Sequence, residues 1–460
     1  MDNKKDFGQK IINLSLRPLR PRASARDIIQ GYFMKKYVFI FYLLFFICYL
    51  LPAQMTVSGI LDTTVSMNAG AGDAPNFSMG FEEYANIRFQ SRMRDNEKIS
   101  GTISGAINLI AASGDNAFGL AAMRYPIGEN FVGAIELERL QFRLSGEHLD
   151  FNGGLFRLPF GFGQVWGCSD FLNPRNPLKP DARLRGILGT SLTWFPTDEL
   201  KLLWFYAAPR NALSNEGKGS LVGLSLDSHW EKASIQALYS YETPIPESDV
   251  PLFPETDILL HPASPYGIHR IGFSLKADIE AGFVIDALYT YNHDAVTARL
   301  DSQNKDDDLF FLFDGLSFSA GVDYSFFEGD LIAMIEYLYN GKTSATALGY
   351  GGSFVNNHYL YTGFTYRFTD FTNLSLALIS GLDDISFTPI ISVNHELFQG
   401  ATLMITAQVP LDRDLFHGDG NRGELGPIRP DNLQPHTPDG NLVGRFGSYF
   451  NCSARIRLRF

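Results

Sequence analysis

Polar and apolar residues alternate with a period of two over most of this chain. In residues 444–460 the even positions, from Phe446 to Phe460, are small or apolar, and most odd positions are polar. Residues 316–326 and 401–409 repeat the pattern. Successive side chains of a β-strand point to opposite faces, so this period predicts strands with one apolar and one polar face. A soluble β-sandwich and a membrane barrel would both satisfy it.

The pattern extends from residue 55 to the last residue, with turn-forming residues between the strands. No helical window of useful length competes. The predicted strands number about eighteen: 56–68, 77–93, 98–112, 131–147, 149–160, 186–196, 200–208, 220–230, 232–243, 267–279, 281–293, 313–327, 330–341, 356–369, 372–381, 386–398, 401–410 and 444–460.

The connections between these strands alternate in length. Tight turns, such as "RDNEK" and "HWEK", alternate along the chain with long links, such as 161–185 and 411–443. An even number of antiparallel strands, with short turns at one end and long loops at the other, is typical of bacterial outer-membrane barrels. A soluble all-β enzyme would scatter its loop lengths. The pattern therefore predicts an all-β, antiparallel up-and-down transmembrane barrel.

The two faces of the strands support a barrel with a wet interior. In residues 316–326 the apolar face combines aliphatic and aromatic side chains, whereas the other face carries small hydroxyls. A sandwich would place large aliphatic residues on its buried face and tolerate charges outside. Phe and Tyr gather near strand ends, as in the aromatic girdles at the two membrane interfaces.

The region before the first strand has the features of an export signal. Met34 and two lysines precede an apolar run at 37–51, and Ala53 follows it. This order predicts a signal peptide at 34–53, cleaved after Ala53. A signal anchor is the alternative, although the run is short for a membrane span. Residues 1–33 are basic and featureless, so we interpret them as a mis-assigned extension, with residues 54–460 as the barrel.

Charge and cysteine content narrow the function classes. Without residues 1–54 the chain keeps 29 basic and 47 acidic residues, a net charge of −18. Such a surface does not favour nucleic acid as a partner. Cys168 and Cys452 then remain, too few for a disulfide framework, and the histidines lack metal-ligand spacing. We therefore expect no cofactor and no metal.

The C-terminal strand carries a family resemblance. Residues 445–460, which alternate and end in Phe460, resemble the C-terminal signal by which the barrel-assembly machinery recognises outer-membrane proteins. With the signal peptide and the loop rhythm, the mature chain resembles the porin class of bacterial outer-membrane β-barrels. The resemblance implies an integral outer-membrane location, contact with outer-membrane lipid and a channel function. It identifies no substrate family.

The third long loop, 161–185, is the most unusual connection. It contains three prolines and four basic residues. In porins, which the chain resembles, the third extracellular loop folds into the barrel and sets its narrowest point. On that basis Arg175, Lys179 and Arg183 are constriction candidates, and the alternative is a surface loop stiffened by proline.

Charged residues on the polar strand faces are further candidates for the pore lining. Basic candidates lie on strands near the barrel closure, and acidic candidates lie across from them. Two opposed walls would produce a transverse field that orients dipolar solutes and sorts ions, whereas the alternative is that they are rim charges, as expected for Arg457 and Arg459. The candidates are Arg88, Arg92, Arg143, Arg157, Arg445, Arg455, Glu242, Asp286, Asp323 and Glu336.

These features predict a porin-like channel for passive diffusion of small hydrophilic solutes. A fatty-acid-type transporter of hydrophobic solutes is an alternative, although the strand pattern leaves no room for the N-terminal plug of that class. A structural or adhesive barrel whose long loops bind host molecules is another. His293 beside Asp294 lacks an accompanying serine motif, so we expect no enzyme activity. Both a monomer and an oligomer are compatible with the sequence.

Overall fold

The chain is described by a computed structural model that covers residues 55–70, 76–94, 99–114, 124–128, 131–173, 186–209, 219–244, 267–293, 310–341, 357–383, 385–409, 411 and 448–460. Residues Thr56–Phe460 form one compact unit. The predicted signal peptide at 34–53 and the extension at 1–33 lie outside the described residues.

The described unit consists almost entirely of β-strands. The strands are β1 (Met55–Gly70), β2 (Asn76–Arg94), β3 (Ser100–Gly114), β4 (Arg124–Gly128), β5 (Phe131–Ser145), β6 (Leu149–Phe156), β7 (Ile187–Trp194), β8 (Leu200–Ala207), β9 (Leu221–Trp230), β10 (Ala233–Glu242), β11 (Ile268–Asp278), β12 (Gly282–Asn292), β13 (Leu316–Phe326), β14 (Leu331–Asn340), β15 (His358–Thr369), β16 (Thr372–Gly381), β17 (Ser386–Phe398), β18 (Ala401–Gln408) and β19 (Ser448–Arg459). Two 3₁₀ turns, η5 (Phe310–Gly315) and η6 (Phe327–Gly329), flank β13. Among the described residues no helix is long and apolar enough to cross a membrane.

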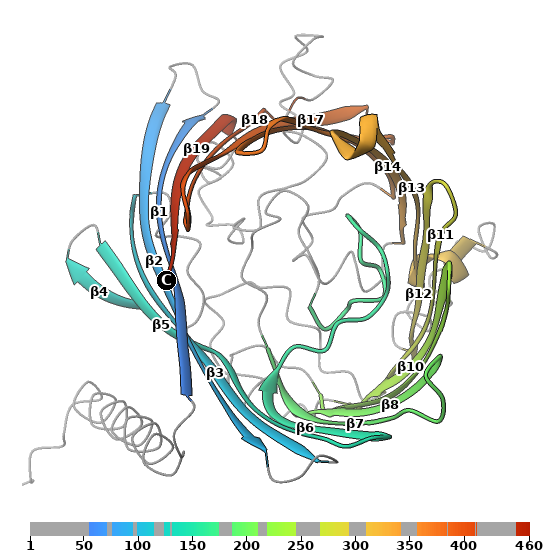
Figure 1. Cartoon of the computed structure of the whole chain (residues 1–460). Helices are drawn as coiled ribbons and strands as arrows, with labels where there is room; N and C mark the ends of the chain where they lie inside the picture. Colours follow the sequence, from blue (N-terminus) through green and yellow to red (C-terminus); the bar gives the residue numbers. More distant parts are fainter. Residues whose placement is uncertain are drawn as a thin grey trace, which may run out of the picture. The chain divides into compact units, whose positions relative to one another are not determined.

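The strands form a single antiparallel sheet that closes on itself (Figure 1). Each strand pairs with its neighbours in sequence, and β19 returns to pair with β1, from Ile60 opposite Arg459 to Ala69 opposite Phe450. The short strand β4 is the exception, because β3 bypasses it and pairs directly with β5. The closed circuit therefore has 18 strands, as the sequence predicts.

The two faces of the wall differ as the alternation predicts. On β13 the side chains of Ser317 and Ser319 are buried on the inner face. Val322, Tyr324 and Phe326 on the other phase are exposed to the outside. Outward positions are thus aliphatic or aromatic, and inward positions carry hydroxyl, amide and charged groups, the arrangement of a membrane barrel with a polar lumen.

The clearest boundary errors affect two predicted strands. The predicted strand 149–160 stops at Phe156, because Pro159 cannot donate to the sheet and the chain turns inward there. The predicted strand 313–327 includes the end of η5 and the start of η6. The pattern also missed β4. Residues 444–447 of the predicted last strand lie outside the described residues.

The closing strands β1 and β19 meet where the ring of Phe460 lies over Gly59. The Phe460 ring lies where a Cβ on Gly59 would be, 2.2 Å from the nearest ring carbon. Gly59 N donates to Phe460 O at 2.8 Å, and Phe460 N donates to Gly59 O at 3.1 Å. The absence of a side chain at Gly59 lets the last residue complete the sheet.

Candidate functional site: the lumen and its infolded segment

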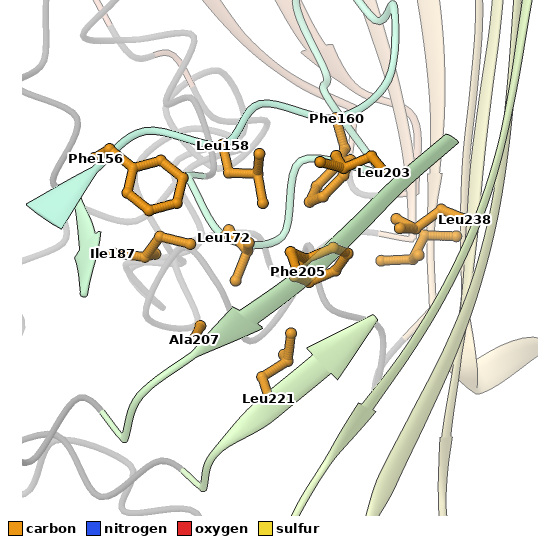
Figure 2. Packing of buried hydrophobic residues seen from close by; sticks show 11 residues of the cluster. Phe156, Leu158, Phe160, Leu172, Ile187, Leu203, Phe205, Ala207, Leu221 and Leu238 are labelled. Atoms are coloured by element: carbon orange, nitrogen blue, oxygen red, sulfur yellow. The ribbon is translucent and has the colours of Figure 1, made fainter. Parts of the chain in front are cut away.

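Residues 157–173, here called the infolded segment, leave the wall after β6 and lie inside the ring of strands (Figure 1). The first part of the segment packs on apolar side chains of the inner face. Figure 2 shows Leu158, Phe160 and Leu172 against Leu203 and Phe205 of β8. The Phe160 and Phe205 ring centroids are 5.1 Å apart. Burial of these side chains favours this position over one in solvent.

The tip of the infolded segment packs on a second, distant part of the wall. Trp166 is fully buried with its ring centroid 5.8 Å from that of Tyr359 on β15. Val165 and Cys168 belong to the same apolar cluster, which includes Leu338 of β14. The segment therefore crosses the inner face from β8 to β15.

Buried wall carboxylates hold the tip through hydrogen bonds. The backbone N–H groups of Val165 and Trp166 each donate to Glu336 at 3.0 Å. Ser169 donates to Asp286 through its backbone N–H at 3.2 Å and through its hydroxyl. Asp286 is 0% exposed and Glu336 is 1% exposed. A buried donor left without an acceptor is costly, so these two residues anchor the segment.

Two neutral side chains add contacts nearer the short turns. Gly161 N donates to Gln236 Oε1 of β10 at 2.6 Å, and Gln164 Nε2 donates to Asp323 of β13 at 2.8 Å. Both wall residues lie in the half of their strand nearer the short-turn end. Because the segment leaves β6 at the long-loop end, it extends deep along the lumen.

Glycines in "GFG" let the backbone approach the wall. Gly161 has a φ of +75°, and an added Cβ would lie 2.6 Å from an Asp286 oxygen. A Cβ on Gly163 would lie 2.7 Å from Trp166 O. A larger residue at Gly161 would meet both backbone strain and a collision with the anchoring carboxylate.

The basic candidates near the closing pair have partners on the inner face. Arg143 forms an ion pair with Asp150 of β6, and Arg457 forms a bidentate pair with the buried Asp62 of β1 at 2.9 Å. Arg457 is thus held by the wall near the end of β19, where the sequence predicts a rim charge. Arg455 donates to Thr64 at 3.3 Å.

Arg157 and Arg88 share a polar network around the buried Asn86 and Glu138. Arg157 Nη2 donates to Glu138 at 2.8 Å, Asn86 donates to Glu138 at 2.7 Å, and Arg88 Nε donates to Asn86 Oδ1 at 2.5 Å. The network links β2, β5 and the start of the infolded segment. Arg92 is exposed. Arg175, Lys179, Arg183 and Arg445 lie outside the described residues.

The four acidic candidates are distributed between two roles. Glu242 pairs with Arg270 of β11 at 2.7 Å. Asp286, Asp323 and Glu336 all contact the infolded segment. Much of the expected acidic wall is therefore engaged by the segment rather than bare toward the lumen.

Comparison with known proteins adds a fold assignment. No protein-family model and no curated protein matches the sequence. Among solved structures, OccAB1 of Acinetobacter baumannii superposes with a TM-score of 0.53 at 9% identity, covering 88% of this chain and 96% of that one. OccK5 (OpdH) of Pseudomonas aeruginosa gives a TM-score of 0.50 at 8% identity, covering 88% and 97%. The chain has the porin fold. At these identities the likeness concerns the fold alone.

Sequence reasoning missed several residues of this porin-fold interior. Glu138 and Arg139 are consecutive residues of β5, and a β-bulge at this point leaves Glu138 without a partner residue on β3. Because of the bulge, both side chains face inward. Arg270 lies 4.9 Å from the ring centroid of Phe171 in the infolded segment. The sequence offered one signal of the bulge, namely two adjacent charged residues in an alternating strand. Strict alternation would place one of these charges on the outward face.

Proposed function

We propose that the protein is an outer-membrane channel for the passive diffusion of small hydrophilic solutes, with the loop 161–185 forming its constriction. The observation that carries the proposal is the infolded segment anchored across the inner face of a closed 18-strand barrel. An outward apolar face suits lipid, and an inward polar face suits water. The described part of the loop, 161–173, narrows the lumen, and we extend the same role to 174–185.

The interior favours hydrophilic over hydrophobic solutes. Apolar side chains do face inward, such as Leu288 and Leu338, but both are fully buried within the clusters that include the infolded segment. A transporter of fatty-acid type would need apolar surface open to its solute. The apolar inner surface of this barrel instead holds the constriction in place.

Single-channel conductance in planar bilayers tests the proposal. The purified barrel should form open, water-filled channels, and deletion of residues 162–171 should raise the conductance of each channel because it removes the tip. Deletion of an equal length from the long link at 245–266 serves as the matched control and should leave the conductance nearly unchanged. A barrel that inserts but conducts no ions would contradict the channel function, and equal conductance in both deletions would contradict the constriction.

The proposal includes the route to the membrane. We infer that export uses the signal peptide at 34–53, that the assembly machinery recognises the strand ending in Phe460, and that no catalytic step is involved. Mass spectrometry of the membrane-extracted protein should find a mature N-terminus near Gln54. Recovery of peptides from residues 1–33 in that fraction would contradict the proposed start and cleavage.

A further inference from the structure

The outward face of the barrel contains one carboxylate that breaks its apolar pattern. Glu82 and Glu83 are consecutive on β2, and alternation places Glu82 inward and Glu83 outward. Glu83 Oε1 and Oε2 each accept from Thr63 Oγ1 of β1 at 3.0 Å, so Thr63 also faces outward. Among the strand residues whose side chains the structure describes, the other carboxylates take the inward phase. A charge that faces lipid is costly and calls for an explanation.

Glu83 lies in a hollow in the outer surface. The hollow has a volume of about 410 Å³ and crosses β2, β3 and β5. Small residues make its floor, since Glu83 stands opposite Ala111, which stands opposite Gly133. Larger side chains border it: Leu61, Leu109 and Ile135. Apart from Glu83 the walls are almost entirely apolar, and the volume falls in the range of small-ligand sites.

The depth of the hollow matches the anatomy of a lipid. The next outward row toward the long-loop end contains Ser113 and Phe131, where the pairing of β3 with β5 ends. Glu83 therefore lies about 7 Å along the strand from the end of this pairing, and β2 continues beyond it to Asn76. Leu109 and Ile135 continue the hollow toward the centre of the wall. A ligand can thus place a polar head at Glu83 and an alkyl chain over these two residues.

Charge complementarity identifies the head group. The hollow needs a cation with an apolar body attached, and a protonated amine supplies both hydrogen-bond donors and charge for a carboxylate. A second copy of the barrel fits less well, because no Lys or Arg takes the outward phase among the described strand side chains. We propose that this hollow binds an amine-bearing membrane lipid, with its ammonium group on Glu83 and Thr63 and its acyl chain over Leu109 and Ile135.

This inference rests on the proposed function, because only a barrel embedded in a membrane presents this face to lipid. Native mass spectrometry of the detergent-purified full barrel tests it, with phosphatidylethanolamine, its N-acetylated derivative and phosphatidylglycerol of identical acyl chains as probes. The wild type should retain phosphatidylethanolamine at least fivefold more than either of the other lipids. Glu83→Gln should abolish that preference, whereas the adjacent, inward Glu82→Gln should preserve it.

A second variant separates the hollow from the charge. Ala111→Leu fills the floor and leaves Glu83 in place, so it should reduce retention of phosphatidylethanolamine. Equal retention of all three lipids by the wild type, or an unchanged preference in Glu83→Gln, would overturn the proposal. A cross-linked oligomer that requires Glu83 would overturn it in favour of a contact between copies. Conductance of each variant in planar bilayers is the independent readout of channel function, and it should match the wild type whether or not the lipid site exists.

Discussion

At the scale of single residues, Asp286 and Glu336 hold the infolded segment against the inner face of the barrel. Both side chains are buried in the wall, and each receives hydrogen bonds from the segment. The backbone of Val165 and Trp166 supplies the donors for Glu336, so this anchor depends on chain path, whereas Asp286 also accepts from the Ser169 hydroxyl. Substitution of either wall residue leaves the segment's own sequence intact and still loosens it.

Replacement of Asp286 and Glu336 by alanine should release the tip. Loss of each anchor leaves buried donors of the segment without an acceptor, which costs about 1–3 kcal/mol apiece. We expect single-channel recordings of the double variant to show a higher mean conductance and more frequent fluctuations. Glu396→Gln, which changes an inward carboxylate of β17 remote from these anchors, is the control. Recordings from the double variant that match the wild type would show that other contacts suffice.

Phe460 and Gly59 form a residue pair at the closing strands, and either member can be tested. Gly59→Val places branched carbons where the Phe460 ring lies, so closure should weaken and the yield of folded barrel in the outer membrane should fall severalfold. Phe460→Ser should have the same effect with export intact, whereas Phe460→Tyr should retain most of the yield. Normal outer-membrane levels of both disruptive variants would argue against a role for this pair in assembly.

At the scale of elements, the infolded segment acts as a strap between distant strands. It touches β8 through Phe160, β12 through Ser169 and β14 through Trp166. Its path explains why the polar inner face of these strands includes large apolar residues. The basic candidates Arg175, Lys179 and Arg183 follow this segment in the same loop. Any effect of these three residues on ions is therefore a prediction about the loop.

Neutralisation of Arg175, Lys179 and Arg183 should shift the reversal potential of the channel toward cation preference. Basic groups at a constriction raise the local anion concentration, because low-dielectric walls focus the field. The shift should shrink in concentrated salt, where the Debye length falls to about 3 Å at 1 M. Neutralisation of Lys232 at a short turn is the control. An unchanged reversal potential in the triple variant would place these three residues away from the ion path.

The sequence predicts the elements better than the interior. Alternation along each strand indicates which side chains face lipid, and the alternation of short and long connections indicates the number of strands in the barrel. Both features could therefore be derived from local sequence patterns. The inward course after Phe156 depends on partners far away in sequence, such as Glu336, and no local pattern reveals them. The bulge at Glu138 and the hollow at Glu83 also depend on neighbouring strands, although each leaves a trace as two consecutive charged residues.

At the scale of the whole molecule, every strand of the circuit has two paired edges. A barrel without a free edge resists denaturation as a unit, because no strand can be peeled away without opening a neighbour. We expect the protein to migrate faster in detergent electrophoresis when unheated than after boiling. Identical migration of heated and unheated samples of conducting protein would contradict closure of the sheet.

The pairing of Ile60 with Arg459 also has a consequence for biosynthesis. This pair joins residues from the two ends of the barrel sequence, and contacts between residues so far apart are slow to form. The first strand leaves the ribosome long before the last, and a strand edge without a partner is a template for aggregation. The edge of β1 therefore has to stay protected from aggregation until β19 is available to pair with it.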